Sequence, residues 1–257
     1  MTLPISLIVI TLNEEKNIER CLRSAPFVSD ILVLDSGSQD HTLEIAKRLG
    51  ARTLQEPWRG YARQKIRATA LARNDWVLSL DADEALSEAA KGEILKLFQK
   101  PEELLNIDAF SFPRKANYLG RWMLHGGMYP DRQIRLYHRA RAQWTETSVH
   151  EKVEAKHIQS LQGDILHWPF PTLSSQIETI DRYSSLRAGD LAKRGKKYSP
   201  IKMMLKTFFK FFEAFFLKQG YRDGQEGLIA AMVSAFSTFL RWAKLREIRS
   251  QTGSKEP

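Results

Sequence analysis

Short apolar runs alternate with amphipathic segments in the first half of the chain. Three runs have the β-branched or apolar composition of strands covered on both faces: Ile5–Leu12, Ile31–Leu34 and Trp76–Leu80. The segments between them predict helices at Asn17–Ser24, Leu43–Leu49 and Tyr61–Ala72, and a further short strand at Arg52–Gln55. Strands and helices that alternate at short spacing predict an α/β fold with a mainly parallel sheet.

Each of the three apolar runs ends in polar side chains. Asn13 and Glu14 follow the first run, Asp35 follows the second, and Asp81 and Asp83 follow the last. In open α/β sheets, ligands sit beyond the carboxyl ends of the strands. These residues are therefore expected to meet at one edge and to form a nucleotide site there.

Asp81 and Asp83 are two positions apart, so in extended geometry their side chains point the same way. Two carboxylates so placed can share one hard divalent cation, Mg²⁺ or Mn²⁺, which in turn can hold a diphosphate. The alternative for such a short motif is a solvated acidic turn. The sequence contains neither G-x-G-x-x-G nor a P-loop, so neither a dinucleotide fold nor a P-loop enzyme is favoured.

The middle of the chain predicts two alternating strands, Asp108–Arg114 and Arg132–Tyr137. Between them lies a loop rich in glycine and aromatic residues, which includes Tyr118, Trp122 and His125. Exposed aromatic faces suit the stacking of a sugar ring, so these three residues are candidates for binding a sugar, the acceptor in the reaction considered below. Ordinary packing of the aromatic side chains is the alternative.

The C-terminal segment is basic and rich in phenylalanine. Between Arg182 and Arg222, eleven Lys or Arg residues stand against two acids, so this segment carries a charge equal to the whole net charge of +9. Helices are predicted at Ile177–Gly195, Met203–Leu217 and Leu228–Leu240, the last too short to span a bilayer. Apolar helices with basic flanks favour an element that lies in the interface of an anionic membrane. Packing onto the rest of the protein, or a dimer interface, is the alternative.

Composition limits the class of protein, the compartment and the partners that fit this chain. A chain of 257 residues with 43% hydrophobic and 27% charged residues is expected to be globular. One cysteine permits no intramolecular disulfide and suits a reducing compartment. Nucleic acid is not expected as a partner, because the basic segment is interleaved with phenylalanine at core spacing and contains no known nucleic-acid motif.

Three separated motifs occur in one order: SLIVITLNEEKNIERCL, DILVLDSGSQDHT and WVLSLDADE. Together they resemble the nucleotide-sugar half of the family 2 inverting glycosyltransferases, which have the GT-A fold. The linking segment Gly60–Lys65 resembles the WaaE/KdtX-like enzymes of lipopolysaccharide core biosynthesis, although Ile66 replaces the asparagine usual there. The resemblance implies a Rossmann-like GT-A domain over residues 1–170, with a nucleotide-sugar half (1–100) and an acceptor half (101–170). Residues 171–257 are expected, from their own basic and apolar pattern, to form the helical membrane-interface appendage.

The resemblance also implies roles for residues at the donor site. Asn13 and Glu14 would lie beside the nucleotide base, and Asp35 would contact the nucleoside. Asp81 would contact the ribose or donor, and Asp83 would ligate the metal. Gln64 and Lys65 could reach the donor. The alternatives are a helix N-terminal acid for Glu14, a turn carboxylate for Asp35 and an exposed helix face for Gln64 and Lys65.

An inverting transfer requires a base for the acceptor hydroxyl. The hypothesis is that Glu151 is this base, with Asp131 as the alternative, and that His150 lies beside the metal or diphosphate. A solvent-facing pair at His150 and Glu151 is the competing interpretation.

The expected function is the transfer of a sugar, glucose first, from a nucleotide sugar (a UDP-sugar first) to the lipid A–core acceptor. The expected location is peripheral, at the cytoplasmic face of the inner membrane. Two other functions stay open at this point. One is a nucleotidyltransferase, which would normally have a basic, glycine-rich loop where this chain has Leu12–Glu15. The other is a non-catalytic membrane-surface adaptor, which would leave the acidic strand ends without a purpose.

Overall fold

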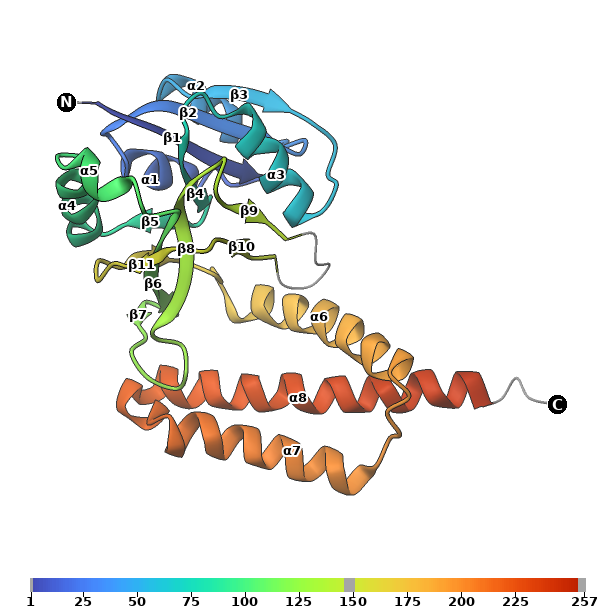
Figure 1. Ribbon diagram of the computed structural model, residues 1–257. Coiled ribbons are helices and arrows are strands. Elements are labelled where there is room, and N and C mark those ends of the chain that lie inside the picture. The colour runs from blue at the N-terminus through green and yellow to red at the C-terminus, as the bar shows by residue number, and fades with distance from the viewer. Residues whose placement is uncertain (1, 146–150, 254–257) are drawn as a thin grey trace. The chain divides into compact units, whose positions relative to one another are not determined.

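Strand β1 (Leu3–Thr11) is the centre of the parallel part of the sheet, and all but one of its residues are buried. It pairs in parallel with β2 (Val28–Asp35) on one side and with β4 (Trp76–Asp81) on the other. The register places Thr11 opposite Asp35 and Ile10 opposite Asp81. The polar residues that end these strands therefore share one edge (Figure 1).

The computed structural model describes residues 2–145 and 151–253. The main sheet follows the order β3-β2-β1-β4-β8-β6-β12-β5, in which β8 is antiparallel to both β4 and β6. The remaining strands are β3 (Arg52–Gln55), β5 (Glu84–Leu86), β6 (Ala109–Tyr118), β7 (Arg121–Trp122), β8 (Asp131–His138), β9 (Gln143–Trp144), β10 (Val153–Glu154), β11 (Ile158–Ser160) and β12 (Ile165–His167).

The helices follow the apolar periodicity of the sequence. Ser87 caps α4, because its hydroxyl accepts a hydrogen bond from the Ala90 backbone N–H. The helices are α1 (Ile18–Arg23), α2 (Thr42–Arg48), α3 (Tyr61–Leu71), α4 (Glu88–Leu97), α5 (Pro101–Leu104), α6 (Leu173–Lys193), α7 (Pro200–Phe212) and α8 (Gly224–Gly253), with a π-helical turn η1 (Glu213–Leu217) and a 3₁₀ turn η2 (Gly220–Asp223).

Alternate residues of β1 pack into two different apolar clusters. Leu7 and Val9 belong to one cluster, and Ile8 and Ile10 belong to the other. This is the period-2 alternation of a strand that is covered on both faces. Each fully buried aliphatic side chain stabilises the fold by roughly 1.5–3 kcal/mol. The predicted α/β class, with a GT-A-like, mainly parallel first half and C-terminal helices, is confirmed.

The chain divides into two compact units, which we name the sheet unit and the helical unit. The sheet unit comprises Met1–Lys115 and Asp131–His167. The helical unit comprises Ala116–Pro130 and Trp168–Pro257, so it includes a loop from the middle of the chain. In the helical unit, α8 packs against both α6 and α7, around the buried Ala188, Trp242 and Leu245.

Helix α8 differs from its predicted range. The sequence predicts a helix at Leu228–Leu240, whereas α8 runs from Gly224 to Gly253. By length and composition alone, one helix of the described chain, Gly220–Gln251, could cross a membrane. The prediction that this element is too short was wrong, because the helix continues past Leu240, where Trp242 and Leu245 are buried in the core of the helical unit.

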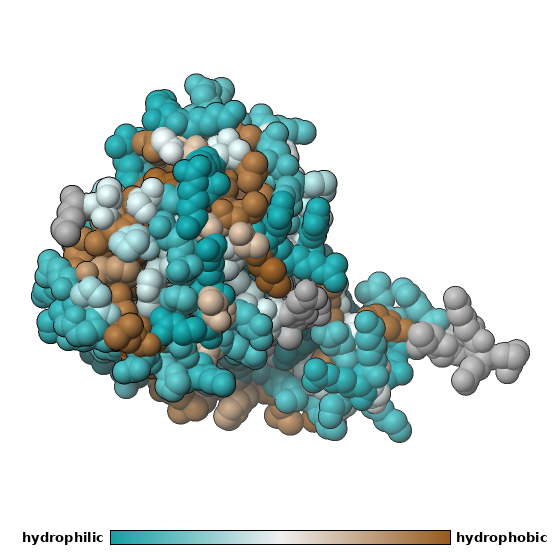
Figure 2. All heavy atoms as spheres, turned by 45° about the horizontal axis from the view of Figure 1, so that its top comes forward, coloured by the Kyte–Doolittle hydropathy of each residue, from teal (hydrophilic) through white to brown (hydrophobic). Residues whose placement is uncertain are grey.

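Helix α7 has no buried residue. Its exposed side chains are mostly large and apolar, among them Ile201, Leu205, Phe208 and Phe209, which are 60–71% exposed. In Figure 2, apolar side chains in brown gather along the lower margin, the side on which α7 lies in Figure 1. The helical unit therefore presents an apolar surface that the described residues do not cover.

Candidate active site

The candidate site lies at the carboxyl ends of β1, β2 and β4, which are adjacent and parallel. Asn13 and Glu14 follow β1, while Asp35 and Asp81 are the last residues of β2 and β4. The sheet topology alone brings these residues to one edge. Asp83 follows two residues after Asp81, in the turn that leads to β5.

Asp81 is held between two cations. Its Oδ1 lies 2.9 Å from the Lys65 Nζ, and its Oδ2 accepts a hydrogen bond of 2.8 Å from Arg135. Burial alone would raise the pKa of Asp81, but the charges of Arg135 and Lys65 hold that pKa well below its usual range. Asp81 is therefore an anion whose charge is already compensated by protein side chains.

Glu84 stabilises the turn between β4 and β5. Its side chain is fully buried, and its Oε1 lies 2.6 Å from Arg135 and 3.1 Å from Arg114. Its Oε2 accepts a hydrogen bond of 3.1 Å from the Asp81 backbone N–H. Because every polar atom of this carboxylate is used inside the protein, Glu84 orients the turn rather than facing a ligand.

Asp83 has a different partner from Asp81. Its Oδ2 lies 3.3 Å from the Nε2 of His167, the last residue of β12. Among the described residues, no three His, Cys, Asp or Glu side chains gather closely enough to form a metal centre by themselves. The predicted metal neighbour His150 lies outside the described residues.

A two-residue metal site still fits this geometry. Asp83 and His167 offer one carboxylate and one imidazole, and Mg²⁺-type sites commonly complete their shell with water and substrate phosphate oxygens. Asp81 fits less well as a ligand, since both of its oxygens face cations. His167 was not predicted, because it lies more than eighty positions from Asp83 on a strand of three residues.

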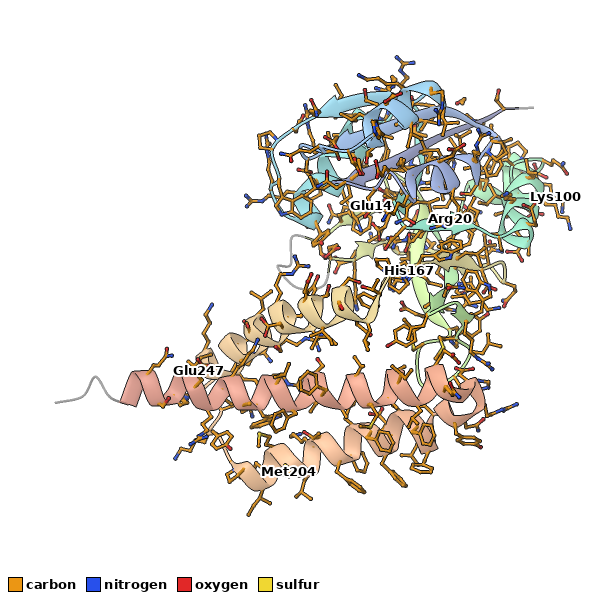
Figure 3. All side chains as sticks on the ribbon, turned by 180° about the vertical axis from the view of Figure 1, so that it is seen from behind. Glu14, Arg20, Lys100, His167, Met204 and Glu247 are labelled. Carbon is orange, nitrogen blue, oxygen red and sulfur yellow. The ribbon has the colours of Figure 1, made fainter. Side chains whose placement is uncertain are left out.

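Glu14 lies near the same carboxylates. Burial raises the pKa of Glu14, and the charges of Asp83, Asp40 and Asp81 raise it further, against a hydrogen bond of 2.8 Å from Asn17. Figure 3 shows Glu14, Arg20 and His167 in the same region of the sheet unit, although they come from different elements. Glu14 is thus more easily protonated than an ordinary glutamate.

Asn13 adopts a left-handed backbone conformation, with φ at 57°. Its Oδ1 accepts a hydrogen bond of 2.8 Å from the Gln39 N–H, and its own N–H donates to the Ser38 Oγ at 2.8 Å. Asparagine tolerates this conformation better than most residues. Asn13 therefore joins the end of β1 to the turn that follows β2.

Asp35 is fully buried and stabilises its own turn. Its carboxylate accepts hydrogen bonds from the N–H groups of Gly37 at 2.9 Å and Ser38 at 2.8 Å, and from the Gln55 side chain at 3.1 Å. Burial alone would raise the pKa of Asp35, but these bonds and one from the Ser38 hydroxyl hold it below its usual value. This geometry is that of the turn-carboxylate alternative, and contact with a nucleoside would require an exchange of one of these bonds.

Gln64 and Lys65 of α3 are buried, at 0% and 3% exposure, and do not form an exposed helix face. Gln64 donates to the Ser36 Oγ at 3.2 Å, while its Oε1 is buried without a hydrogen-bond partner among the described residues. A buried acceptor without a partner is costly, so this atom is suited to a donor group on a ligand.

Glu151 lies beside this cluster. Its Oε1 is 3.6 Å from the Lys65 Nζ, and its side chain is 22% exposed. Asp131 is instead held by Arg114, with a bond of 2.9 Å from the Nε, and by Gln133 at 2.8 Å. Burial alone would raise the pKa of Asp131, but Arg114 holds it below its usual value, which makes Asp131 a weaker base.

Comparison with known proteins decides the family. The model of "Glycosyl transferase family 2" matches residues 6–160, more than half of the chain. The chain belongs to glycosyltransferase family 2.

Relatives in this family cover nearly the whole chain. An uncharacterized glycosyltransferase of Rickettsia typhi is 33% identical over 95% of this chain and 87% of its own length. The lipopolysaccharide core biosynthesis glycosyltransferase LpsC of Rhizobium meliloti is 29% identical over 95% of this chain and 92% of its own length. The predicted resemblance to family 2 and to its lipopolysaccharide-core branch is confirmed.

A solved structure is also similar to part of this chain. Glucosyl-3-phosphoglycerate synthase of Mycobacterium tuberculosis, in complex with Mn²⁺, UDP-glucose and phosphoglyceric acid, is 29% identical over 45% of this chain and 44% of its own, with a TM-score of 0.34. A likeness at this TM-score adds nothing to the assignment to family 2.

The three candidates for acceptor binding lie in the helical unit of this glycosyltransferase. Tyr118 is fully buried, and its hydroxyl donates to the Gln176 Oε1 at 2.6 Å, which favours packing over sugar stacking. Trp122 packs edge-to-face against Trp168 at 5.2 Å. The His125 Nδ1 lies 2.9 Å from Asp223.

Proposed function

We propose that this protein is an inverting, metal-dependent glycosyltransferase that moves a hexose, glucose first, from a UDP-sugar to the lipopolysaccharide inner core. One observation carries the proposal: Glu14, after β1, and Asp81, at the end of β4, lie at one edge of the sheet, and Lys65 contacts both Asp81 and Glu151. Membership of family 2 supports the reaction class. UDP-galactose and ADP-heptose are the other donors to test.

On the donor side, Asp83 and His167 would hold a divalent cation, Mg²⁺ or Mn²⁺, together with the diphosphate of the donor. When bound, such a cation would neutralise the diphosphate leaving group. Lys65 and Arg135 keep Asp81 ionised, so Asp81 can accept a hydrogen bond from a ribose or sugar hydroxyl. Asn13, Glu14, Asp35 and Gln64 would line the nucleoside side.

Glu151 would act as the base. Its carboxylate accepts the proton of the acceptor hydroxyl while that oxygen forms its bond to the anomeric carbon. The bond between this carbon and the diphosphate oxygen breaks at the same time, and the configuration inverts. The Lys65 Nζ lies 3.6 Å from the Glu151 Oε1, so Lys65 can orient this carboxylate. Asp131 stays the alternative, although Arg114 already holds it.

The proposed acceptor is the lipid A–core, which the similarity to LpsC supports. An acceptor of this kind is anchored in a membrane, and we propose a peripheral location at the cytoplasmic face of the inner membrane. The apolar surface of α7 supports this location, together with the basic segment between Arg182 and Arg222.

The test is a transfer assay with purified protein, a truncated inner-core acceptor and each of UDP-glucose, UDP-galactose and ADP-heptose. One donor is expected to give a product whose new linkage has the anomeric configuration opposite to that of the donor, as measured by NMR. A retained configuration would overturn the proposed inversion. Transfer from these donors to soluble acceptors alone would overturn the proposed acceptor.

A further inference from the structure

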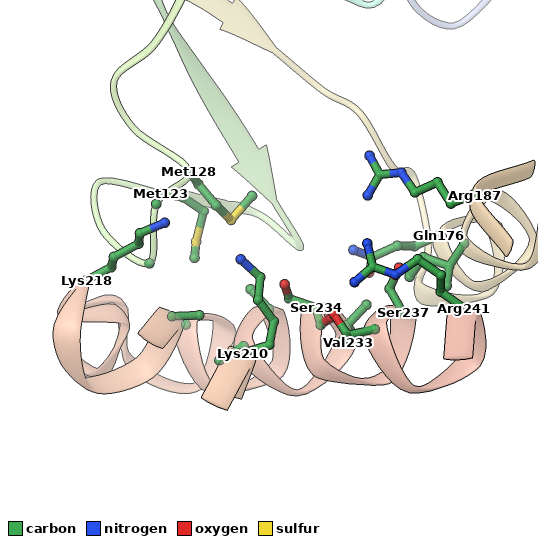
Figure 4. Close-up of a pocket in the computed structure, with 18 residues that line it drawn as sticks. Met123, Met128, Gln176, Arg187, Lys210, Lys218, Val233, Ser234, Ser237 and Arg241 are labelled. Atoms are coloured by element: carbon green, nitrogen blue, oxygen red, sulfur yellow. The ribbon is translucent and has the colours of Figure 1, made fainter. Parts of the chain in front are cut away.

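The helical unit contains a cavity of about 500 Å³ that no role above uses. Its walls come from α6, α7, α8 and the loop after β7, all within that unit. A cavity of this size is in the range of small-molecule sites. Figure 4 shows two arginines, Arg187 and Arg241, at one end and two lysines, Lys210 and Lys218, toward the other.

The charge in this cavity is only partly compensated. Glu213 lies 3.1 Å from the Nζ of Lys210 and 2.7 Å from that of Lys218. Arg187 and Arg241 have no ion-pair or hydrogen-bond partner within residues 2–145 and 151–253, and the Arg241 Nε is buried. Arg187 is exposed to water, so the cost falls on Arg241, whose buried Nε lacks an acceptor that an anion would supply.

The rest of the lining supplies neutral donors. Ser234 and Ser237 line the cavity from the same face of α8 that carries Arg241, while the Thr238 hydroxyl beside them donates to the Ser234 carbonyl. Gln176 lines the cavity from α6. Its Oε1 accepts the hydrogen bond of the Tyr118 hydroxyl, so its amide N–H groups are not used in that bond. Hydroxyl and amide donors beside two guanidinium groups match the oxygens of a phosphate, which Arg binds in a bidentate manner.

We propose that this cavity binds a phosphate group carried by the membrane-anchored acceptor. That the phosphate belongs to the acceptor rests on the proposed function; the cationic character of the cavity does not. The phosphate takes the place between Arg187 and Arg241, with the hydroxyls of Ser234 and Ser237 as further donors. The segment from α6 to α8 is then a binding element for the acceptor and not only a structural one.

The two faces of the α7–α8 layer favour a lipid-borne phosphate over a free one. Lys210 of α7 and Ala214 of η1 line the cavity, whereas Phe208 and Phe212 of α7 are exposed at 68% and 37% on the other side of that helix. Met204 points away from α8 in Figure 3. An interfacial helix buries its apolar face by about 5–10 Å, and a helix is about 10 Å across, so the cavity would lie at the level of lipid headgroups.

The test measures binding of the full-length protein to micelles of bisphosphorylated lipid A, micelles of chemically dephosphorylated lipid A, and inorganic phosphate. The variants Arg241→Gln and Arg187→Gln remove the cavity charges one at a time. Arg182→Gln is the matched control, because it removes the same charge from the exposed surface of α6 and does not line the cavity. Melting temperature reports whether each variant is folded.

The wild type is expected to bind the bisphosphorylated lipid at least about tenfold more tightly than the dephosphorylated one, and each cavity variant should lose this preference. The control should keep it. Equal binding of both lipids by the wild type, an unchanged preference in both folded cavity variants, or binding of inorganic phosphate without competition from lipid A would each overturn the proposal. The proposed donor site contains none of these residues, so a failure of the donor chemistry would be seen separately in a titration with UDP-glucose.

Discussion

At the scale of single residues, Lys65 contacts both Asp81, on the proposed donor side, and Glu151, the proposed base. Its Nζ lies 2.9 Å from Asp81, 3.6 Å from Glu151 and 4.8 Å from the centroid of the Trp144 ring. With 3% exposure, this ammonium is held by anions and an aromatic face instead of water. Glu151 is therefore fixed beside the carboxylate that ends β4.

Replacement of this base candidate gives the first prediction. Glu151→Gln keeps the shape but removes the proton acceptor, so kcat should fall by roughly 10²–10⁴-fold. The Kd for the donor should change little, since the donor-side residues are intact. Steady-state kinetics and donor titration check this.

The matched control for this prediction is Glu154→Gln, an exposed glutamate on β10. It should retain normal turnover. If Glu151→Gln also turns over at nearly the normal rate, the role of base passes to Asp131.

Sequence reasoning placed the acids at the strand ends because the order of parallel strands fixes where their last residues lie. The sequence does not predict which basic side chains these acids contact. Asp81 and Glu84 meet Arg114 and Arg135, which come from β6 and β8 much later in the chain. His167 was missed for the same reason, since only tertiary packing brings it to Asp83.

At the scale of elements, a buried carboxylate joins β1, β2, β3 and the end of α3. Asp30 accepts hydrogen bonds from the Ser6 hydroxyl at 2.8 Å, from Arg52 at 2.8 and 3.0 Å, and from the Arg73 N–H at 3.1 Å. Burial alone would raise the pKa of Asp30, but these bonds hold it below its usual value. This junction sets the register of the strands that carry the site.

The second prediction concerns the pH dependence of stability. Since the pKa of Asp30 is lower in the folded than in the unfolded chain, its stabilisation is present above the unfolded value of about 3.9 and is lost as the pH falls through the folded value. Asp30→Asn should lower the free energy of unfolding at pH 7 by about 1–3 kcal/mol, with a smaller difference near pH 3. Urea denaturation across this range measures both.

Asp75→Asn, at a side chain that is 66% exposed, is the control and should change stability little at either pH. A constant difference between Asp30→Asn and the wild type from pH 7 to pH 3 would contradict the assigned role of the ionised carboxylate.

The third prediction tests the apolar surface of α7. Phe208 and Phe209 are 68% and 60% exposed, so replacing both with serine should leave the melting temperature almost unchanged. Sedimentation with anionic phospholipid vesicles should fall several-fold, because burial of these rings in the interface is lost. Leu105→Ser, at an equally exposed apolar residue of the sheet unit, is the control. Unchanged sedimentation of the Phe208 and Phe209 variant would assign this surface to another partner.

The predicted segments include six of the eight α-helices that the described residues form, but the ends of these helices were not predictable. The apolar pattern of the last helix stops near Leu240, whereas α8 continues because Trp242 and Leu245 pack against α6. The sequence also does not predict that residues 116–130 belong to the helical unit. This loop is held there by hydrogen bonds from the N–H groups of Leu124 and His125 to the distant Asp223.

At the scale of the whole molecule, the two units carry different chemistry. The sheet unit holds every candidate for donor binding and the base, and the family 2 model matches most of it. The helical unit holds the exposed apolar surface and the cationic cavity. The excess positive charge of the sequence falls in the second unit, which is consistent with an acidic, membrane-bound partner.

The central claim is that the acidic strand ends hold an activated sugar through a divalent cation, and calorimetric titration with UDP-glucose, with and without Mn²⁺, tests it most directly. The wild type should bind the donor more tightly when Mn²⁺ is present. Asp83→Ala should lose this gain, by about tenfold or more, while Asp75→Ala keeps it. Equal, metal-enhanced affinity in the wild type and in Asp83→Ala would contradict the account.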